Sequence, residues 1–143
     1  MDPRISIITL GVSDLGRSRD FYEKGLNWPY LKDKSNEHIA FFEVNRGSLW
    51  LALFPRSELA ADAQVSDSPS GFPGFTLAQL ARDRDEVDAV VEKAVSAGAK
   101  LLKEPQEVFW GGYSAYFSDP DGFLWEVAYN PFSWFEASES EGG

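Results

Sequence analysis

The stretch DPDGFLWEVAYNP, residues 119–131, joins a tight turn to an apolar strand that contains a single acid. Pro120 fixes its own φ and Gly122 tolerates a positive φ, so the first four residues predict a hairpin turn. The eight residues that follow suit a half-buried strand, except that Glu126 stands in their middle. A carboxylate at this place predicts that one face of the strand is not packed in hydrocarbon.

The sequence before this stretch completes a β-α-β-β-β unit over residues 74–132. Strands are predicted in GFTLAQLARD (74–83), KLLKE (100–104), YSAYFS (113–118) and FLWEVAY (123–129). Asp83 and Glu86 have the spacing of a helix capping box, and Gly98 is placed to end that helix. Its apolar stripe consists of Val87, Val90, Val91, Ala94 and Val95.

Residues 1–54 predict an earlier copy of the same β-α-β-β-β unit. The strand ISIITLGV (5–12) precedes a helix that begins at Ser13 or Asp14 and ends at Gly25. Three further strands are predicted in WPYLK (28–32), HIAFFEV (38–44) and SLWLALF (48–54), with the turn NRG between the last two. Residues 55–73 predict a linker loop in which SELAADAQ favours a helical turn, and residues 133–143 predict an acidic tail.

The repeated unit predicts an α+β fold, in which two β-α-β-β-β modules form one compact domain with a cupped, mixed, mostly antiparallel sheet. A helix covers one face of each module, and the other two faces curve together and enclose a space. Glu126 is predicted to face this space together with Leu124 and Ala128. Period-two alternation then turns Trp125 and Val127 towards the helix.

Charge and composition exclude several classes of protein. The net charge of −10, from 23 acidic and 13 basic residues, repels phosphate backbones and argues against nucleic acid as a partner. Cysteine is absent, which removes disulfides, thiolate metal sites and cysteine nucleophiles. No apolar run is long enough to cross a bilayer, so the sequence predicts a cytoplasmic protein that does not bind membranes.

Three stretches resemble the vicinal oxygen chelate superfamily, which includes glyoxalase I, bleomycin-resistance proteins and extradiol dioxygenases. They are ITLGVSDLGRSRDFYEKGLNW, VDAVVEKAVSAGAKLLKEP and GGYSAYFSDPDGFLWEVAYNP, and the resemblance covers roughly residues 5 to 132. It implies the cupped fold described above, and it is specific because several pieces agree in order and spacing. It does not specify an activity, since this fold carries many unrelated functions.

The resemblance also implies where a metal would lie. In metal-dependent members, each half supplies one ligand from its first strand and one from its last. Carried over to this sequence, these positions are Ile7, about Leu51, about Thr76, and Glu126, and a shift of the alignment brings Gln79 into consideration. Glu126 alone keeps a good donor, and one carboxylate does not make a tight transition-metal site. The sequence therefore predicts that the metal centre is missing and that no cofactor is bound.

Other residues are candidates for ligand contact. Trp110 precedes the flexible pair Gly111–Gly112 and is predicted to stack on a ligand, although it also fits a simple hairpin rim. Tyr113 is a further candidate; it and Tyr116 lie on opposite faces of one strand, so at most one of them faces the enclosed space. His38, the one histidine, is predicted to lie on the surface.

Three functions remain open from the sequence. The first is a metal-free protein that binds a small aromatic or cationic molecule in a pocket lined by Glu126, Trp110, Tyr113, Leu51, Thr76 and Ile7. The second is a divalent-metal-dependent lyase, isomerase or dioxygenase of the same superfamily. The third is a structural or regulatory dimer without a ligand. The resemblance implies a homodimer in each case.

Overall fold

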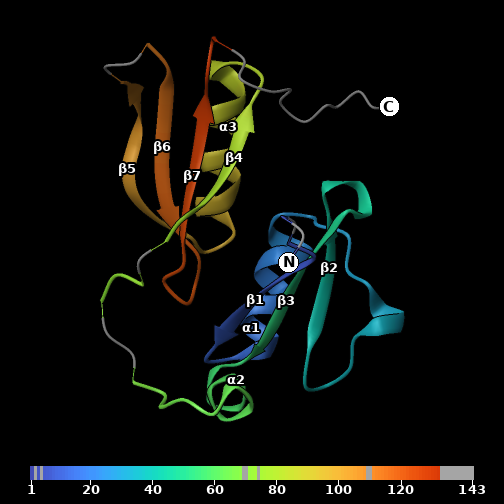
Figure 1. The fold of residues 1–143 in the computed structure, drawn as a ribbon. Coiled ribbons are helices and arrows are strands. Elements are labelled where there is room, and N and C mark those ends of the chain that lie inside the picture. The colour runs from blue at the N-terminus through green and yellow to red at the C-terminus, as the bar shows by residue number, and fades with distance from the viewer. Residues whose placement is uncertain (2, 4, 69–70, 74, 109–110, 133–143) are drawn as a thin grey trace. The chain divides into compact units, whose positions relative to one another are not determined.

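The computed structural model describes residues 1, 3, 5–68, 71–73, 75–108 and 111–132. The chain divides into two compact units, Met1–Gly71 and Phe72–Gly143, and each is described by itself (Figure 1). The mixture of helices and mixed sheets confirms the predicted α+β class. Within the described part of the chain, no helix has both the length and the hydropathy needed to cross a membrane.

The first unit contains a three-stranded sheet with the order β1-β3-β2. Its strands are β1 (Ile7–Val12), β2 (Ala40–Val44) and β3 (Leu49–Pro55), and β1 runs parallel to β3 while β2 runs antiparallel to it. Helix α1 (Leu15–Asp20) begins after Asp14, whose side chain accepts a hydrogen bond of 3.0 Å from the backbone N–H of Arg17. The helix continues as a π-helical turn, Phe21–Gly25, so the predicted helix and its end are confirmed.

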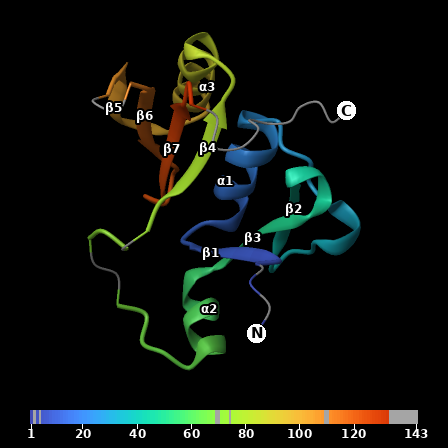
Figure 2. The same ribbon diagram turned by 45° about the horizontal axis from the view of Figure 1, so that its top comes forward.

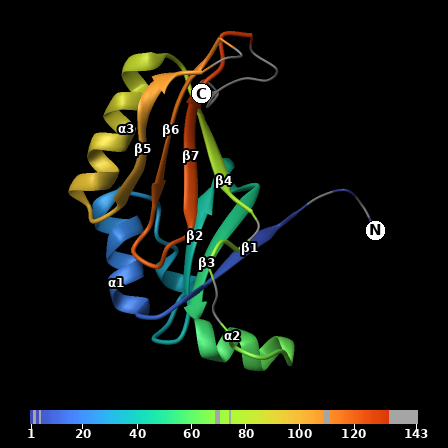
Figure 3. The same cartoon turned by 90° about the vertical axis from the view of Figure 1, so that its left-hand side faces the viewer.

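The helix side of this sheet forms the core of the first unit. Phe42 of β2 is fully buried, and its ring centroid lies 6.0 Å from that of Tyr22 in the π-helical turn. Leu51 pairs with Phe42 in the sheet and therefore shares its face. Leu10, Val12 and Leu53 are almost completely buried as well. Figure 3 shows α1 along this face.

The second unit contains a four-stranded sheet with the order β4-β7-β6-β5. The strands are β4 (Leu77–Ala81), β5 (Lys100–Glu107), β6 (Tyr113–Ser118) and β7 (Leu124–Tyr129). β4 is parallel to β7, and the other pairs are antiparallel. Helix α3 (Arg84–Ser96) lies along one face of this sheet (Figure 3).

Helix α3 begins at the predicted cap, with one difference in its hydrogen bonds. The Asp83 side chain accepts a hydrogen bond of 2.8 Å from the backbone N–H of Glu86. The Glu86 carboxylate accepts from the backbone N–H of Arg82, at 2.6 Å, and thus reaches one residue beyond the position that a capping box uses. Both acids still satisfy N–H groups at the start of the helix.

The turn of residues 119–122 forms as predicted. The Asp119 carboxylate accepts hydrogen bonds of 2.9 Å from the backbone N–H groups of Asp121 and Phe123. Gly122 has φ +91°, a backbone conformation that residues with a side chain rarely adopt. This turn fixes the register in which β6 and β7 pair.

Strand β5 is irregular in a way that the sequence did not indicate. Its pairing with β6 shifts between Leu101 and Lys103, and again between Lys103 and Gln106. At each shift β5 contains one more residue than the strand opposite it, which is the definition of a β-bulge. The alternation of faces therefore restarts along β5.

Two expectations differ from the structure. The predicted strand at residues 28–32 is wrong, because only Tyr30 pairs, with Phe42, and a 3₁₀ turn, Lys32–Lys34, follows. The predicted linker contains a complete helix, α2 (Arg56–Ala63), which contacts β1 and β3 (Figure 2). The helical turn expected in SELAADAQ is thereby confirmed and is longer than predicted. The predicted acidic tail lies outside the described residues.

Candidate functional site

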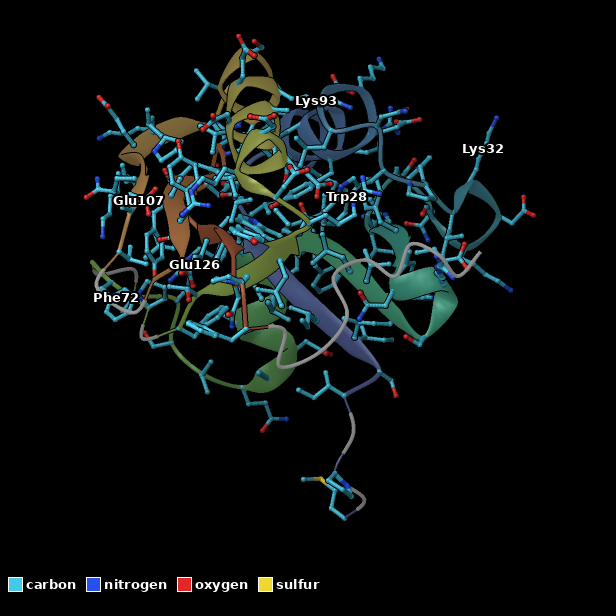
Figure 4. All side chains as sticks on the ribbon, turned by 90° about the horizontal axis from the view of Figure 1, so that it is seen from above. Trp28, Lys32, Phe72, Lys93, Glu107 and Glu126 are labelled. Atoms are coloured by element: carbon cyan, nitrogen blue, oxygen red, sulfur yellow. The ribbon has the colours of Figure 1, made fainter. Side chains whose placement is uncertain are left out.

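Glu126 lies on the face of the second sheet that is turned away from α3. Its neighbours Trp125 and Val127 are buried on the α3 side, whereas Glu126 is half-buried. Figure 4 shows Glu126 and Lys93 of α3 on opposite sides of the sheet. Leu124 and Ala128 share the face of Glu126, as period-two alternation predicts. We call this face of the four-stranded sheet the open face.

Tyr116 is the immediate partner of Glu126. It lies directly opposite Glu126 in the register of β6 and β7. Burial raises the pKa of Tyr116, and the negative charge of Glu126 and its capacity to accept a hydrogen bond from the phenol raise it further. The phenol is protonated at neutral pH and can donate to the acid.

Tyr113 lies on the other face, against α3, and not beside Glu126 as expected. Its hydroxyl donates a hydrogen bond of 2.8 Å to Asp88 of α3, and this bond, with burial, raises the pKa of Tyr113. The guanidinium of Arg84 lies 5.6 Å from the centroid of the Tyr113 ring and 5.4 Å from that of Tyr129. Any ligand contact of Tyr113 stays a prediction, but its face is the helix side.

Arg84 also connects α3 to the end of β5. Its Nε and Nη2 atoms each donate a hydrogen bond of 3.0 Å to the Glu107 carboxylate. This bidentate pair lowers the pKa of Glu107. Arg84 pairs with Glu107, and the Tyr113 hydroxyl with Asp88, so these groups are engaged in holding α3 against the sheet.

In the first unit, Ile7 and Trp50 pair with each other on the face away from α1. Ile7 is 47 % exposed, and the Trp50 ring centroid lies 5.2 Å from that of Phe41. Leu51 points to the α1 side of the sheet and is buried in the core. The prediction that Leu51 lines a ligand pocket on the other face is therefore wrong.

The two capping aspartates show why Leu51 was the wrong choice. Asp14 and Asp83 begin the helices of their units in the same way. The residues two positions before these caps pair with the ends of β3 and β7: Val12 with Pro55, and Ala81 with Tyr129. Counting back three residues from these partners places Ala52 at the position that Glu126 occupies in the second half.

This alignment gives a central row of three residues in each half. In the first half the row is Thr9, Ala52 and Phe41, and in the second half it is Ala78, Glu126 and Tyr116. The first row offers one hydroxyl group, and the second pairs a carboxylate with a phenol. Of these two central rows, only that of the second half therefore contains a carboxylate.

The remaining candidates lie elsewhere. Thr76 precedes β4 and is exposed, and Gln79 pairs with Val127, which puts it on the helix side of the sheet. The His38 side chain is 65 % exposed, and its Nε2 lies 3.4 Å from a carboxylate oxygen of Glu37. Trp110 lies outside the described residues.

Known proteins resemble this chain in both sequence and fold. The model of the Glyoxalase/Bleomycin resistance protein/Dioxygenase superfamily matches residues 4–127. The chain belongs to this superfamily. A metallothiol transferase FosB from Lysinibacillus sphaericus is 32 % identical over 123 residues, which are 85 % of this chain and 79 % of that protein.

Solved structures of superfamily members agree with this assignment. A glyoxalase-related enzyme from Fulvimarina pelagi has a TM-score of 0.79 and 35 % identity, covering 90 % of this chain and 89 % of that one. A lactoylglutathione lyase from Agrobacterium tumefaciens has a TM-score of 0.68 and 25 % identity, covering 95 % of this chain and all of the other (100 %). Names such as metallothiol transferase raise the question of a metal in this superfamily member.

The residues at the implied ligand positions do not fit a transition-metal ion. With the correction from Leu51, these positions are Ile7, Ala52, Thr76 and Glu126, which supply two hydrocarbon side chains, one hydroxyl and one carboxylate. Such ions in proteins are held by imidazole, thiolate or several carboxylate groups. Among the residues that the structure describes, no three histidine or acidic side chains gather in a way that could hold a metal.

Proposed function

We propose that this superfamily member binds a small organic molecule with a cationic or aromatic group on the open face of its second sheet, without metal chemistry. The observation that supports this most directly is the Glu126–Tyr116 pair on the sheet face opposite α3. A carboxylate has about four lone-pair sites, so even with Tyr116 as one donor Glu126 can still accept from a ligand.

The surroundings of Glu126 favour binding of an organic cation. Ala78 lies beside it on β4, and Leu80 and Ala128 form the next pair along the same face. The exposed Ala78 and the half-buried Leu80 can contact the hydrocarbon part of a ligand, while Glu126 neutralises its charge. A half-buried carboxylate binds a cation more strongly than a fully solvated one, since less water screens the pair.

Calorimetric titration with benzylamine, which carries both an ammonium group and a ring, tests the proposal. We expect Glu126→Gln to weaken the binding by about tenfold, because it removes a charge-assisted hydrogen bond. Glu104→Gln, which removes an exposed charge from β5, is the matched control and is expected to have no effect. Equal affinity in the Glu126→Gln variant would exclude Glu126 as the anchor.

The second candidate is a divalent-metal-dependent enzyme of the superfamily, and the similarity to metallothiol transferases favours it. Metal analysis of the purified protein, followed by titration with Ni²⁺, Zn²⁺, Mn²⁺ and Fe²⁺, separates the two. We expect no stoichiometric metal in the wild type. One equivalent of metal that disappears in the Glu126→Gln variant would establish the alternative.

A further inference from the structure

The open face of the second sheet continues from Glu126 to a lysine on the edge strand. Ala78 pairs with Glu126, Glu126 with Tyr116, and Tyr116 with Lys103. Paired residues of neighbouring strands lie on the same face of a sheet. These four residues therefore form one line across β4, β7, β6 and β5, which we call the Glu126 row.

The two bulges of β5 give this edge its charge. Lys100 pairs with Ser118 and Gln106 pairs with Ser114, so both lie on the same face as Lys103. In a regular strand, residues 100 and 103 would point to opposite faces. The bulge between Leu101 and Lys103 turns both lysines to the open face.

Both lysines are available for a ligand. Lys100 and Lys103 are exposed. Within the described ranges, neither forms an ion pair or a side-chain hydrogen bond. This differs from Arg82 and Arg84, which bind Glu86 of α3 and Glu107 of β5. The cationic groups of the open face thus have no internal partner in the part of the chain that is described.

The row separates opposite charges by a defined length. Neighbouring strands lie about 4.8 Å apart, so the backbones at Glu126 and Lys103 are about 10 Å apart, with Tyr116 between them. A ligand that spans this interval passes over the phenol ring. One end of such a ligand meets a carboxylate and the other meets one or two ammonium groups.

We propose that the ligand of this face is zwitterionic, with a cationic group bound by Glu126, an anionic group bound by Lys103 and Lys100, and a flat or aliphatic middle over Tyr116. This inference rests on the function proposed above and extends it, because it adds an anionic group to the proposed ligand. The simpler account is that the two lysines only keep an edge strand hydrated.

Three related probes distinguish these accounts. In 4-(aminomethyl)benzoate a ring separates an ammonium group from a carboxylate, benzylamine lacks the carboxylate, and 4-methylbenzoate lacks the ammonium group. We expect the wild type to bind the zwitterion about fivefold more tightly than benzylamine at low ionic strength, since an exposed ion pair contributes modestly. That advantage is expected to shrink in high salt.

Variants assign the advantage to residues. Lys103→Gln, alone and combined with Lys100→Gln, is expected to reduce the affinity for the zwitterion to that for benzylamine and to leave benzylamine binding unchanged. Lys93→Gln removes the same charge on the helix side of the sheet and is expected to change neither affinity (Figure 4). Glu126→Gln is expected to weaken both ligands.

The outcomes are separable. If the zwitterion binds less than twofold more tightly than benzylamine, or if the advantage survives the loss of both lysines, the inference is wrong while the proposed function stands. If neither ligand depends on Glu126, both proposals fail. If Lys93→Gln has the same effect as Lys103→Gln, the advantage comes from net charge and not from the Glu126 row.

Discussion

Replacing Ser18 by alanine is expected to stabilise the protein. Ser18 lies in α1 and is fully buried, and its hydroxyl oxygen has no hydrogen-bond partner among the residues that the structure describes. The position lies four residues after the Asp14 cap, and the corresponding position after Asp83 is Val87, which is also fully buried. The site therefore belongs to a packed interior in which a hydroxyl group gains nothing.

The expected change in the free energy of unfolding has three contributions. A buried, unsatisfied polar group costs about 1–3 kcal/mol, and alanine favours a helix over serine by about 0.5 kcal/mol. Removing one oxygen leaves a small void, which offsets part of this gain. We expect Ser18→Ala to raise the free energy of unfolding by about 1–2 kcal/mol, equivalent to roughly 3–6 °C in Tm for a chain of this size.

Urea titration and thermal unfolding, followed by circular dichroism, measure the effect. Ser96→Ala is the control, because Ser96 is an exposed serine at the end of α3 and reports helix propensity alone. The reasoning is refuted if Ser18→Ala gains no more than Ser96→Ala. A loss of stability would mean that the Ser18 hydroxyl makes a hydrogen bond in solution.

Three further variants test other parts of the second unit. The Arg84 pair lowers the pKa of Glu107, so it stabilises the fold above the ordinary carboxyl pKa; Glu107→Gln should lower Tm at pH 7, and the difference should vanish as the pH falls below about 4. The raised pKa of Tyr116 predicts the opposite pH dependence. Any stability advantage of the wild type over Tyr116→Phe should decline above pH 10. The phenolate absorbance of Tyr116 in the wild type should appear at a correspondingly high pH. Gly122→Ala meets no atom within 4 Å but keeps φ near +91°, so urea unfolding should show a loss of about 1–2 kcal/mol, and Gly122→Asn a smaller one.

The parts of the fold that depend on neighbouring residues were predictable from the sequence. The caps at Asp14 and Asp83 and the turn before Gly122 each combine a specific side chain with a specific backbone conformation. The face of Glu126 followed from period-two alternation, because an acid between Trp125 and Val127 has one plausible side to occupy. Such signals act over four or five residues and need no knowledge of the partner strand.

The parts that depend on pairing were not predictable. Residues 28–32 have the composition of a strand, but only Tyr30 finds a partner, and β propensity alone does not create one. Alternation put Tyr113 and Tyr116 on opposite faces without deciding which faced Glu126; the contact of Tyr113 with α3 decides it. Leu51 was one residue away from Ala52, and such a step reverses the face.

Other predictions remain predictions. They include the space enclosed between the halves, the homodimer and the role of Trp110. The order of the helix caps nevertheless offers a general method for repeated folds: Asp14 and Asp83 align the halves more reliably than strand residues, because a cap marks a unique position while an apolar strand tolerates a shift. Counted from the caps through the pairing of Val12 with Pro55 and of Ala81 with Tyr129, Ala52 takes the position equivalent to Glu126.

The irregular pairing of β5 has a consequence for how the molecules behave at high concentration. Leu101 and Leu102 are 38 % and 47 % exposed on a strand at the edge of its sheet, a combination that invites strand-to-strand assembly into fibres. An incoming chain would have to match two interruptions in the spacing of N–H and C=O groups, and it would meet two lysines. Deleting Leu102 to straighten the strand would remove one of these barriers and leave an edge better suited to templating aggregation.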